Sequence, residues 1–252
     1  IIYEYGWPIK FEKEVLKELQ EISIDEVYEK STRTDLTNEL IVTIDGEDAK
    51  DLDDAISLIK LENGHYKLGV HIADVSYFVT EGSKLDQEAY NRSTSVYLAD
   101  RVIPMIPHGL SNDLCSLNPD ELKYTLTCEM ILDESCDVVD HKIFASIIKS
   151  SHRLTYKQVN QLLKENKTVG SPVVDEMLYR MNEIAKTLKQ KRSRRGAIDF
   201  ESIELKFKLD HDGKVTDVIE RKTDEAEMLI ESFMILANET VSKHFYDKGL
   251  PG

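Results

Sequence analysis

The stretch LIVTIDGEDAKDLDDAISLIKLENGHYKLGVHI, residues 40–72, decides the fold and also carries a dense acidic cluster. Residues 40–44 form a short apolar run that predicts a buried strand. The runs AISLIKL and HYKLGVHI flank Asn63-Gly64, a dipeptide that accommodates the positive φ angles of a type I′ turn, so residues 55–72 predict a β-hairpin. The acids between these segments are therefore expected at a strand end.

The rest of the chain predicts helices and further strands around this hairpin. Helical spacing and capping residues predict helices over residues 11–22, after Ser83, after the capping box of Thr155 and Gln158, around residues 177–188, and after the capping box of Asp224 and Glu227. Strands are predicted at residues 126–132, 142–148 and 203–209, the last of them paired with a strand that runs through Ile219. Residues 102–121 contain three prolines and are expected to be mostly irregular.

These elements predict a mixed α/β fold, mainly an antiparallel β-sheet flanked by helices, with the acidic cluster at the floor of a channel. The polar stretch EKSTRTDLTNE, residues 29–39, separates the leading helix from the first strand. We therefore expect an N-terminal linker and helix over residues 1–34 and one domain over residues 35–252.

The composition limits the classes of partner. A net charge of −15 gives no overall attraction to nucleic acid, so a polyanionic partner needs a local basic groove or a bound metal. One basic run, KQKRSRR at residues 189–195, is a candidate RNA contact, although cations at a helix end also complement the helix dipole.

The cysteines and the lack of membrane signals indicate a cellular location. The three cysteines lack CxxC spacing, which favours reduced, buried thiols. No apolar run approaches the roughly 20 residues that span a bilayer, and no signal-peptide pattern is present. We expect a soluble cytoplasmic monomer without a membrane partner.

The acidic cluster needs a compensating interaction. Six acids between Asp45 and Asp54 face only Lys50, and two carboxylates about 4 Å apart repel by roughly 4 kcal/mol at an effective dielectric near 20. A solvated loop is the simpler interpretation, but several such pairs beside a strand would threaten a domain whose stability is about 5–15 kcal/mol.

Protonation or divalent cations can relieve the repulsion, and oxygen ligands select hard ions such as Mg²⁺. The spacing of an EF-hand calcium loop is missing. Two cations about 3.5–4 Å apart would support phosphodiester hydrolysis.

Several motifs resemble one family. The runs TIDGEDAKDLDDAISL, YKLGVHIADVSYFV and STSVYLADRVIPMIPHGLSNDLCSLNP are similar, in this order, to the catalytic RNB domain of the ribonuclease II and ribonuclease R exoribonucleases. RGAIDFES and LIESFMILAN extend the resemblance, which covers nearly all of the chain after its first few dozen residues. The motif RGAIDFES favours ribonuclease R over ribonuclease II.

The resemblance implies roles for the aspartates. Asp45, Asp51, Asp53 and Asp54 match the four aspartates that hold Mg²⁺, or Mn²⁺, and the scissile phosphate. Among them, Asp53 and Asp54 are the expected catalytic residues.

The resemblance also implies RNA contacts. Tyr97 matches an aromatic residue that stacks on the 3′-terminal nucleotide, Phe200 a second aromatic clamp, and Glu231 an acid near that nucleotide. Without the resemblance, these three would be interpreted as packing, core and helix surface. His71 and Asp74 lie in the family signature, but we interpret them as structural.

The implied activity is Mg²⁺-dependent, processive 3′–5′ hydrolysis of single-stranded RNA to nucleoside 5′-monophosphates. The family's arginine-bearing segment of the type Ser-Pro-Ile-Arg-Arg-Tyr and its RNA-binding β-barrels do not occur in this sequence. We therefore expect a truncated catalytic domain that is weak or inactive by itself. Two alternatives stay open, namely a non-catalytic RNA-binding relic and a metal phosphodiesterase that acts on DNA or small nucleotides.

Overall fold

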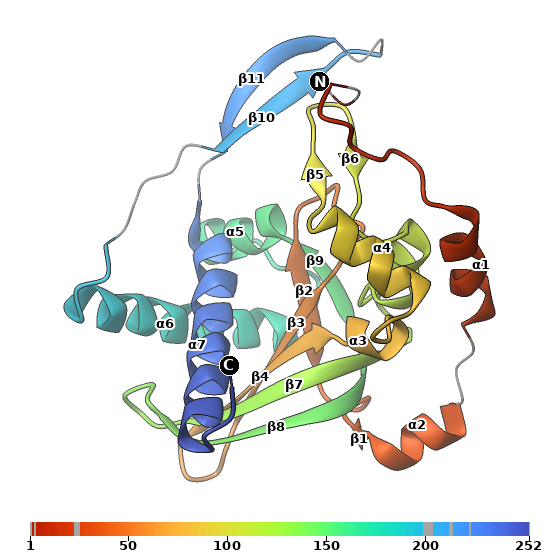
Figure 1. Cartoon of the computed structure of the whole chain (residues 1–252). Coiled ribbons are helices and arrows are strands. Elements are labelled where there is room, and N and C mark those ends of the chain that lie inside the picture. Colours follow the sequence, from red (N-terminus) through yellow and green to blue (C-terminus); the bar gives the residue numbers. More distant parts are fainter. Residues whose placement is uncertain are drawn as a thin grey trace. The chain divides into compact units, whose positions relative to one another are not determined.

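The computed structural model describes residue 2 and residues 4–22, 26–198, 204–211, 214–221 and 223–251 (Figure 1). The chain divides into two compact units. The larger comprises residues 26–74, 115–200 and 223–252, and the smaller comprises residues 1–25, 75–114 and 201–222.

The larger unit contains a seven-stranded sheet in the order β1-β8-β7-β4-β3-β2-β9. The strands are β1 (Thr34–Asp35), β2 (Ile41–Asp45), β3 (Asp54–Lys60), β4 (Tyr66–Ala73), β7 (Leu122–Leu132), β8 (Val138–Lys149) and β9 (His152–Thr155). The inner pairs are antiparallel, whereas β1 pairs with β8, and β9 with β2, in parallel. The expected mixed fold with a mainly antiparallel sheet is confirmed.

The β3–β4 hairpin is confirmed, but its predicted turn type is wrong. Gly64 has a φ of +86°, whereas Asn63 is not among the residues with positive φ. A type I′ turn needs positive φ at both central positions. The connection instead closes with a hydrogen bond from Leu61 N to His65 O, and the Asn63 side chain accepts one from His65 N. Asn63 stabilises the loop through its side chain, so its own φ stays in the ordinary region.

Three helices pack on one face of this sheet (Figure 1). Alternate residues of the strands, such as Val42 and Ile44 in β2 and Leu68 and Val70 in β4, enter a core shared with these helices. The helices of the larger unit are α2 (Glu26–Thr32), α5 (Tyr156–Glu165), α6 (Pro172–Arg194) and α7 (Glu225–Asp247). Both predicted capping boxes are present at the starts of α5 and α7.

A chain of buried polar side chains crosses β3, β4, β7 and β8. The His71 ring lies between Ser57 Oγ at 3.1 Å and Thr127 Oγ1 at 2.8 Å, and the chain continues from Thr127 through Ser146 to Thr125. All five side chains are buried. Each hydroxyl therefore has a partner inside the protein, and His71 is structural, as the sequence indicated.

Asp74 is also structural. Its carboxylate accepts a hydrogen bond from Arg33 Nη2 at 2.7 Å, while Arg33 Nε donates to Glu29 at 2.7 Å. The Arg33 guanidinium lies over the Tyr124 ring, 4.9 Å from its centre. This nearly buried network ties α2 to the sheet, so residues 26–35 are part of the larger unit.

The smaller unit consists of short elements. They are α1 (Lys13–Glu21), α3 (Val75–Phe78), α4 (Lys84–Arg92), the π-helix η1 (Leu110–Leu114), the hairpin of β5 (Val96–Tyr97) and β6 (Val102–Ile103), and the hairpin of β10 (Glu204–Leu209) and β11 (Val215–Arg221). Ser83 caps α4 by accepting a hydrogen bond from Asp86 N, as predicted. Residues 102–121 are mostly irregular, apart from β6 and η1.

The cysteines agree with the expectation from their spacing. Cys115, Cys128 and Cys136 are free and buried. Among the residues that the structure describes, no helix combines the length and the apolar composition that crossing a membrane requires.

Candidate functional site

The first predicted ligand, Asp45, lies at the edge of the sheet. It is the last residue of β2, and in the parallel pairing with β9 its register partner is Thr155. Thr155 is the N-cap of α5. Asp45 ends a strand, as the buried run before it predicted. Because parallel strands end at the same edge of a sheet, it also lies where α5 begins.

Residues that directly follow η1 hold the loop between β2 and β3 through hydrogen bonds. The Ser116 hydroxyl donates to Lys50 O at 2.9 Å and accepts from Leu52 N at 3.1 Å, and Leu117 N donates to Leu52 O at 2.9 Å. Ser116 and Leu52 are fully buried. These bonds fix the backbone on both sides of Asp51.

Two basic residues hold the other half of this loop. Arg153 Nη2 donates a short hydrogen bond to Ala49 O. Lys157 Nζ, in the first turn of α5, lies 3.1 Å from Glu47 Oε1. Asp54 begins β3, and the carbonyl of Asp53 accepts a hydrogen bond from Ala73 N at 2.9 Å. The acidic loop is thus fixed to the sheet at both ends.

The carboxylates influence one another electrostatically. Burial, followed by the charges of Asp54, Asp53 and Asp51, raises the pKa of Asp45 to about 7, while Arg153 opposes the rise. Burial and then Asp53 raise the pKa of Asp54 to about 6. Asp53 is accessible to solvent, yet crowding by protein atoms, followed by the charge of Asp51, raises its pKa as well. The four predicted ligands therefore share one electrostatic environment.

One oxygen of this group lacks a partner. Asp45 Oδ2 is buried and makes no hydrogen bond. A buried carboxylate oxygen without a donor is costly unless it is protonated or faces a cation. An oxygen-only donor set with such an atom fits a hard cation. Among the described residues, however, no three acidic, histidine or cysteine side chains already form a group that could hold a metal ion.

The predicted RNA contacts belong to other segments of the chain. Tyr97 belongs to the smaller unit, where it pairs with Val102 in the β5–β6 hairpin and is 69% exposed, so it is not a core residue. Glu231 lies on α7 with an exposed side chain, 4.0 Å from Arg192 Nη2. Phe200 lies outside the described residues.

Sequence reasoning missed three residues that build the site. Ser116 lies in the motif LSNDLCSL, which carried the resemblance but gave no role to this serine. Arg153 and Lys157 flank the capping box of α5. Only the parallel pairing of β2 with β9 brings them to the acidic loop, and local sequence carries no signal of a pairing across more than 100 residues.

Comparison with known proteins identifies the family. Residues 33–252 match the family profile of the RNB domain. This chain belongs to the RNB family. The resemblance noted in the sequence is therefore confirmed.

Several RNB proteins with names or structures are similar to this chain. Ribonuclease R of Thermotoga maritima is 49% identical over 249 residues, which are 97% of this chain and 35% of that protein. Mycoplasma genitalium RNase R has been solved with double-stranded RNA and with ribose-methylated single-stranded RNA. Both structures match with a TM-score of 0.93 and 31% identity, covering 99% and 98% of this chain and 44% and 39% of theirs.

A third relative shows the fold alone. Yeast Ssd1, described as a pseudonuclease, matches with a TM-score of 0.70 and 22% identity over 90% of this RNB chain and 28% of its own. The chain thus spans well under half the length of these relatives. The RNB fold by itself does not establish catalysis.

Proposed function

We propose that the protein carrying this RNB chain is an exoribonuclease that hydrolyses single-stranded RNA processively from the 3′ end to nucleoside 5′-monophosphates. The observation that carries the proposal is the shared environment of Asp45, Asp51, Asp53 and Asp54, in which three carboxylates raise the pKa of the fourth. Relatives named ribonuclease R, one of them solved with RNA, support the choice of substrate.

We further propose that these four aspartates hold Mg²⁺ or Mn²⁺. A pair of such cations supplies an activated water and a stabilised leaving oxygen for phosphodiester hydrolysis. Asp45 is partly protonated near neutral pH and Asp54 near pH 6, because their pKa values are about 7 and about 6. They release these protons when a cation binds, so cation affinity rises with pH. Ser116 keeps the backbone beside Asp51 in place.

The RNA strand is held by residues other than the aspartates. Tyr97 and Phe200 stack on bases, and Glu231 contacts the terminal nucleotide. Stacking contributes about 1–3 kcal/mol per base and tolerates any sequence, because every base has a flat aromatic face. The 69% exposure of Tyr97 supports this role, since the residue contributes little to the core.

The isolated 252-residue chain binds the cation weakly and turns over slowly. No three of its described side chains are already arranged to hold a metal ion, so binding has to reorganise the aspartates. The free-energy cost of that reorganisation lowers the affinity of the chain for the cation.

The test is product analysis on the full natural protein. A 5′-labelled single-stranded RNA is incubated with Mg²⁺, and we expect nucleoside 5′-monophosphates and a ladder that shortens from the 3′ end. Asp53→Asn should abolish hydrolysis and leave RNA binding intact. Glu47→Gln is the matched control, because Glu47 lies in the same acidic loop and pairs only with Lys157 at its surface. Equal loss in both variants would contradict the assignment.

Two alternatives have specific tests. An RNA-binding relic would bind RNA without any hydrolysis that depends on Asp53. A phosphodiesterase that acts on DNA or small nucleotides would cleave matched DNA and RNA strands equally, because only contacts to the 2′-hydroxyl distinguish them.

We also propose a cytoplasmic monomer. Three free, buried thiols need no oxidising compartment. Light scattering of the purified protein tests the oligomeric state, and a stable dimer would contradict it.

A further inference from the structure

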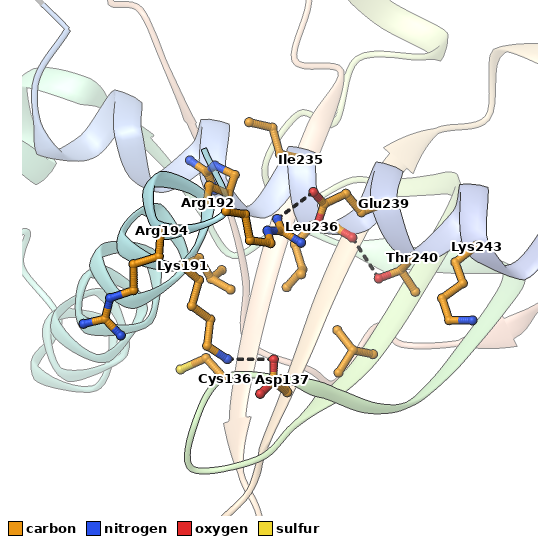
Figure 2. Close-up of a pocket in the computed structure, with 13 residues that line it drawn as sticks. Cys136, Asp137, Lys191, Arg192, Arg194, Ile235, Leu236, Glu239, Thr240 and Lys243 are labelled. Atoms are coloured by element: carbon orange, nitrogen blue, oxygen red, sulfur yellow. Dashed lines mark hydrogen bonds and ion pairs between the residues drawn. The ribbon is translucent and has the colours of Figure 1, made fainter. Parts of the chain in front are cut away.

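A cavity of about 370 Å³ lies in the larger unit, away from the aspartate site (Figure 2). It is bounded by the C-terminal part of α6, the second half of α7 and the start of β8. None of the four predicted metal ligands lines it. Its volume falls in the range of pockets that bind small organic ligands.

The wall of this cavity is strongly basic. Five cationic side chains line it, namely Lys191, Arg192, Arg194, Arg195 and Lys243. Two acids, Asp137 and Glu239, line it with them. Two more acids beside the wall pair with its cations, Asp247 with Lys243 at 2.7 Å and Glu231 with Arg192 at 4.0 Å, so five cations face four acids and a small positive excess remains. The whole chain has a net charge of −15. A local excess of this sign attracts an anion.

Ion pairs within the wall leave donor capacity unused. Lys191 Nζ lies 2.7 Å from Asp137 Oδ1 (Figure 2), but this buried ammonium has no aligned hydrogen bond. Arg195 pairs with Glu239 at 3.0 Å. Arg194 has no ion-pair or hydrogen-bond partner in the part of the chain that the structure describes. Its guanidinium points away from α7 in Figure 2, so contact with a bound anion requires another rotamer of this side chain.

Most of the remaining wall is apolar, and the hydroxyl of Thr240, which also lines it, donates to Leu236 O at 2.8 Å. Val138, Leu188, Ile235 and Leu236 contribute aliphatic side chains from β8, α6 and α7. A small inorganic anion would leave these side chains uncovered. A ligand that carries a negative phosphate on one side and a flat ring on the other would cover the apolar wall and satisfy the cations.

We propose that this pocket binds a nucleoside phosphate. The phosphate meets the ammonium of Lys191 and the guanidinium groups of the α6 terminus, and the base packs on Ile235 and Leu236. Such a ligand has two sources, a free mononucleotide or one nucleotide of an RNA strand. The proposal goes beyond the proposed hydrolysis and does not depend on it, because binding here needs neither the aspartates nor a metal.

The experiment uses the 252-residue chain in EDTA, with methyl-labelled isoleucine and leucine observed by NMR. Adenosine 5′-monophosphate, adenosine, inorganic phosphate, a short oligoadenylate and an acidic peptide are the probes. We expect the mononucleotide or the oligoadenylate to shift the methyl signals of Ile235 and Leu236. Charge-assisted hydrogen bonds contribute about 1.5–3 kcal/mol, so adenosine should bind at least about tenfold more weakly than its 5′-monophosphate.

The double variant Lys191→Gln/Lys243→Gln removes one cation from each helix, and we expect it to weaken binding about tenfold or more. The control Lys189→Gln/Lys248→Gln makes the same charge change outside the wall, on α6 and at the C-cap of α7, and we expect no more than about a twofold effect. Thermal unfolding checks that both variants fold.

Each outcome either tests the proposal or identifies the source of the ligand. Binding by the mononucleotide alone identifies a free nucleotide as the ligand, and binding by the oligoadenylate alone identifies an RNA strand. Methyl shifts with equal strength for inorganic phosphate, or tighter binding of the acidic peptide, would overturn the proposal. So would the absence of shifts with every probe, which would leave the basic wall as a complement to the α6 dipole.

Discussion

Asp45 and Thr155 are register partners at the last position of the parallel strands β2 and β9. Thr155 caps α5, so the carboxylate lies beside the positive end of a helix dipole, which favours its charged form. Burial and three neighbouring carboxylates nevertheless raise the pKa of Asp45 to about 7. These surroundings keep a proton on Asp45 at pH values well above those at which a free aspartate ionises.

We expect Asp45→Asn to stabilise the metal-free chain in a pH-dependent way. The folded pKa of Asp45 lies above its unfolded value, so the folded state holds the proton longer and loses stability as pH rises from about 4 to 7. Replacing the carboxyl removes this loss, which is about 1–2 kcal/mol at pH 8 after allowance for solvent screening. Urea unfolding in EDTA at pH 5 and pH 8 measures the difference.

A surface aspartate provides the control for that measurement. The side chain of Asp120 is 82% exposed, and we expect Asp120→Asn to change stability equally at both pH values. Added Mg²⁺ should stabilise the wild-type chain and leave Asp45→Asn unchanged. A variant that is less stable than wild type at pH 8 in EDTA would contradict the repulsion argument.

Ser116→Ala should impair catalysis more than its cost in stability suggests. The hydroxyl holds Lys50 O and Leu52 N, so its loss frees the backbone around Asp51 and leaves the buried Leu52 N–H and the half-buried Lys50 carbonyl without this partner, which costs about 1–3 kcal/mol. We expect the kcat of the full natural protein to fall about tenfold or more with little change in KM, because misplacement affects the reacting geometry. Steady-state kinetics measure both parameters.

Ser57→Ala is the matched control for this positioning role. Ser57 is also a buried serine in the larger unit, and its hydroxyl contacts His71 rather than the acidic loop. We expect a similar loss of stability and an unchanged kcat. Equal effects of the two substitutions on kcat would show that Ser116 acts only through stability.

His71 should make the chain sensitive to acid. Burial, and then the charge of Lys67, lowers the pKa of His71 to about 3, so the unfolded state binds a proton that the folded state rejects as pH falls below about 6.5. This contribution lowers stability by about 2 kcal/mol between pH 6.5 and pH 5. We expect His71→Gln to be less stable at neutral pH but to have a flatter acid dependence. Urea unfolding across this range tests it, and parallel curves for the two proteins would contradict the assignment.

The elements that the sequence predicted are those with local signals. Alternating apolar residues with Asn63-Gly64 predicted β3 and β4, and the capping boxes predicted where α5 and α7 begin. The sequence did not predict the short strands β1 and β9, because two to four residues are too few to show the alternation of apolar and polar residues that marks a strand. Both are defined by parallel partners far away in the sequence.

The candidate site also has one part that the sequence predicted and another part that only the fold shows. The spacing of the four aspartates was visible in one loop, and the structure places them in one electrostatic environment. The groups that hold this loop, Ser116 and Arg153, come from segments about 65 and 100 residues later, and only the folded sheet brings them close. The sequence predicted only part of the α6–α7 pocket. The basic run at residues 189–195 was a candidate RNA contact, but nothing in the sequence indicated that apolar residues of α7 complete a pocket beside it.

Tyr97→Ala should weaken RNA binding without unfolding the protein. The ring is 69% exposed, so its removal costs little core packing, whereas stacking on one base contributes about 1–3 kcal/mol, equivalent to about a fivefold to hundredfold loss of affinity. Fluorescence anisotropy with labelled single-stranded RNA in EDTA measures binding in the full natural protein. Tyr97→Phe should retain most of the affinity because it keeps the ring.

Tyr90→Ala is the control, since Tyr90 is 82% exposed in the same smaller unit and has no predicted RNA contact. If Tyr90→Ala weakened binding as much as Tyr97→Ala, the effect would belong to the unit as a whole and not to stacking by Tyr97.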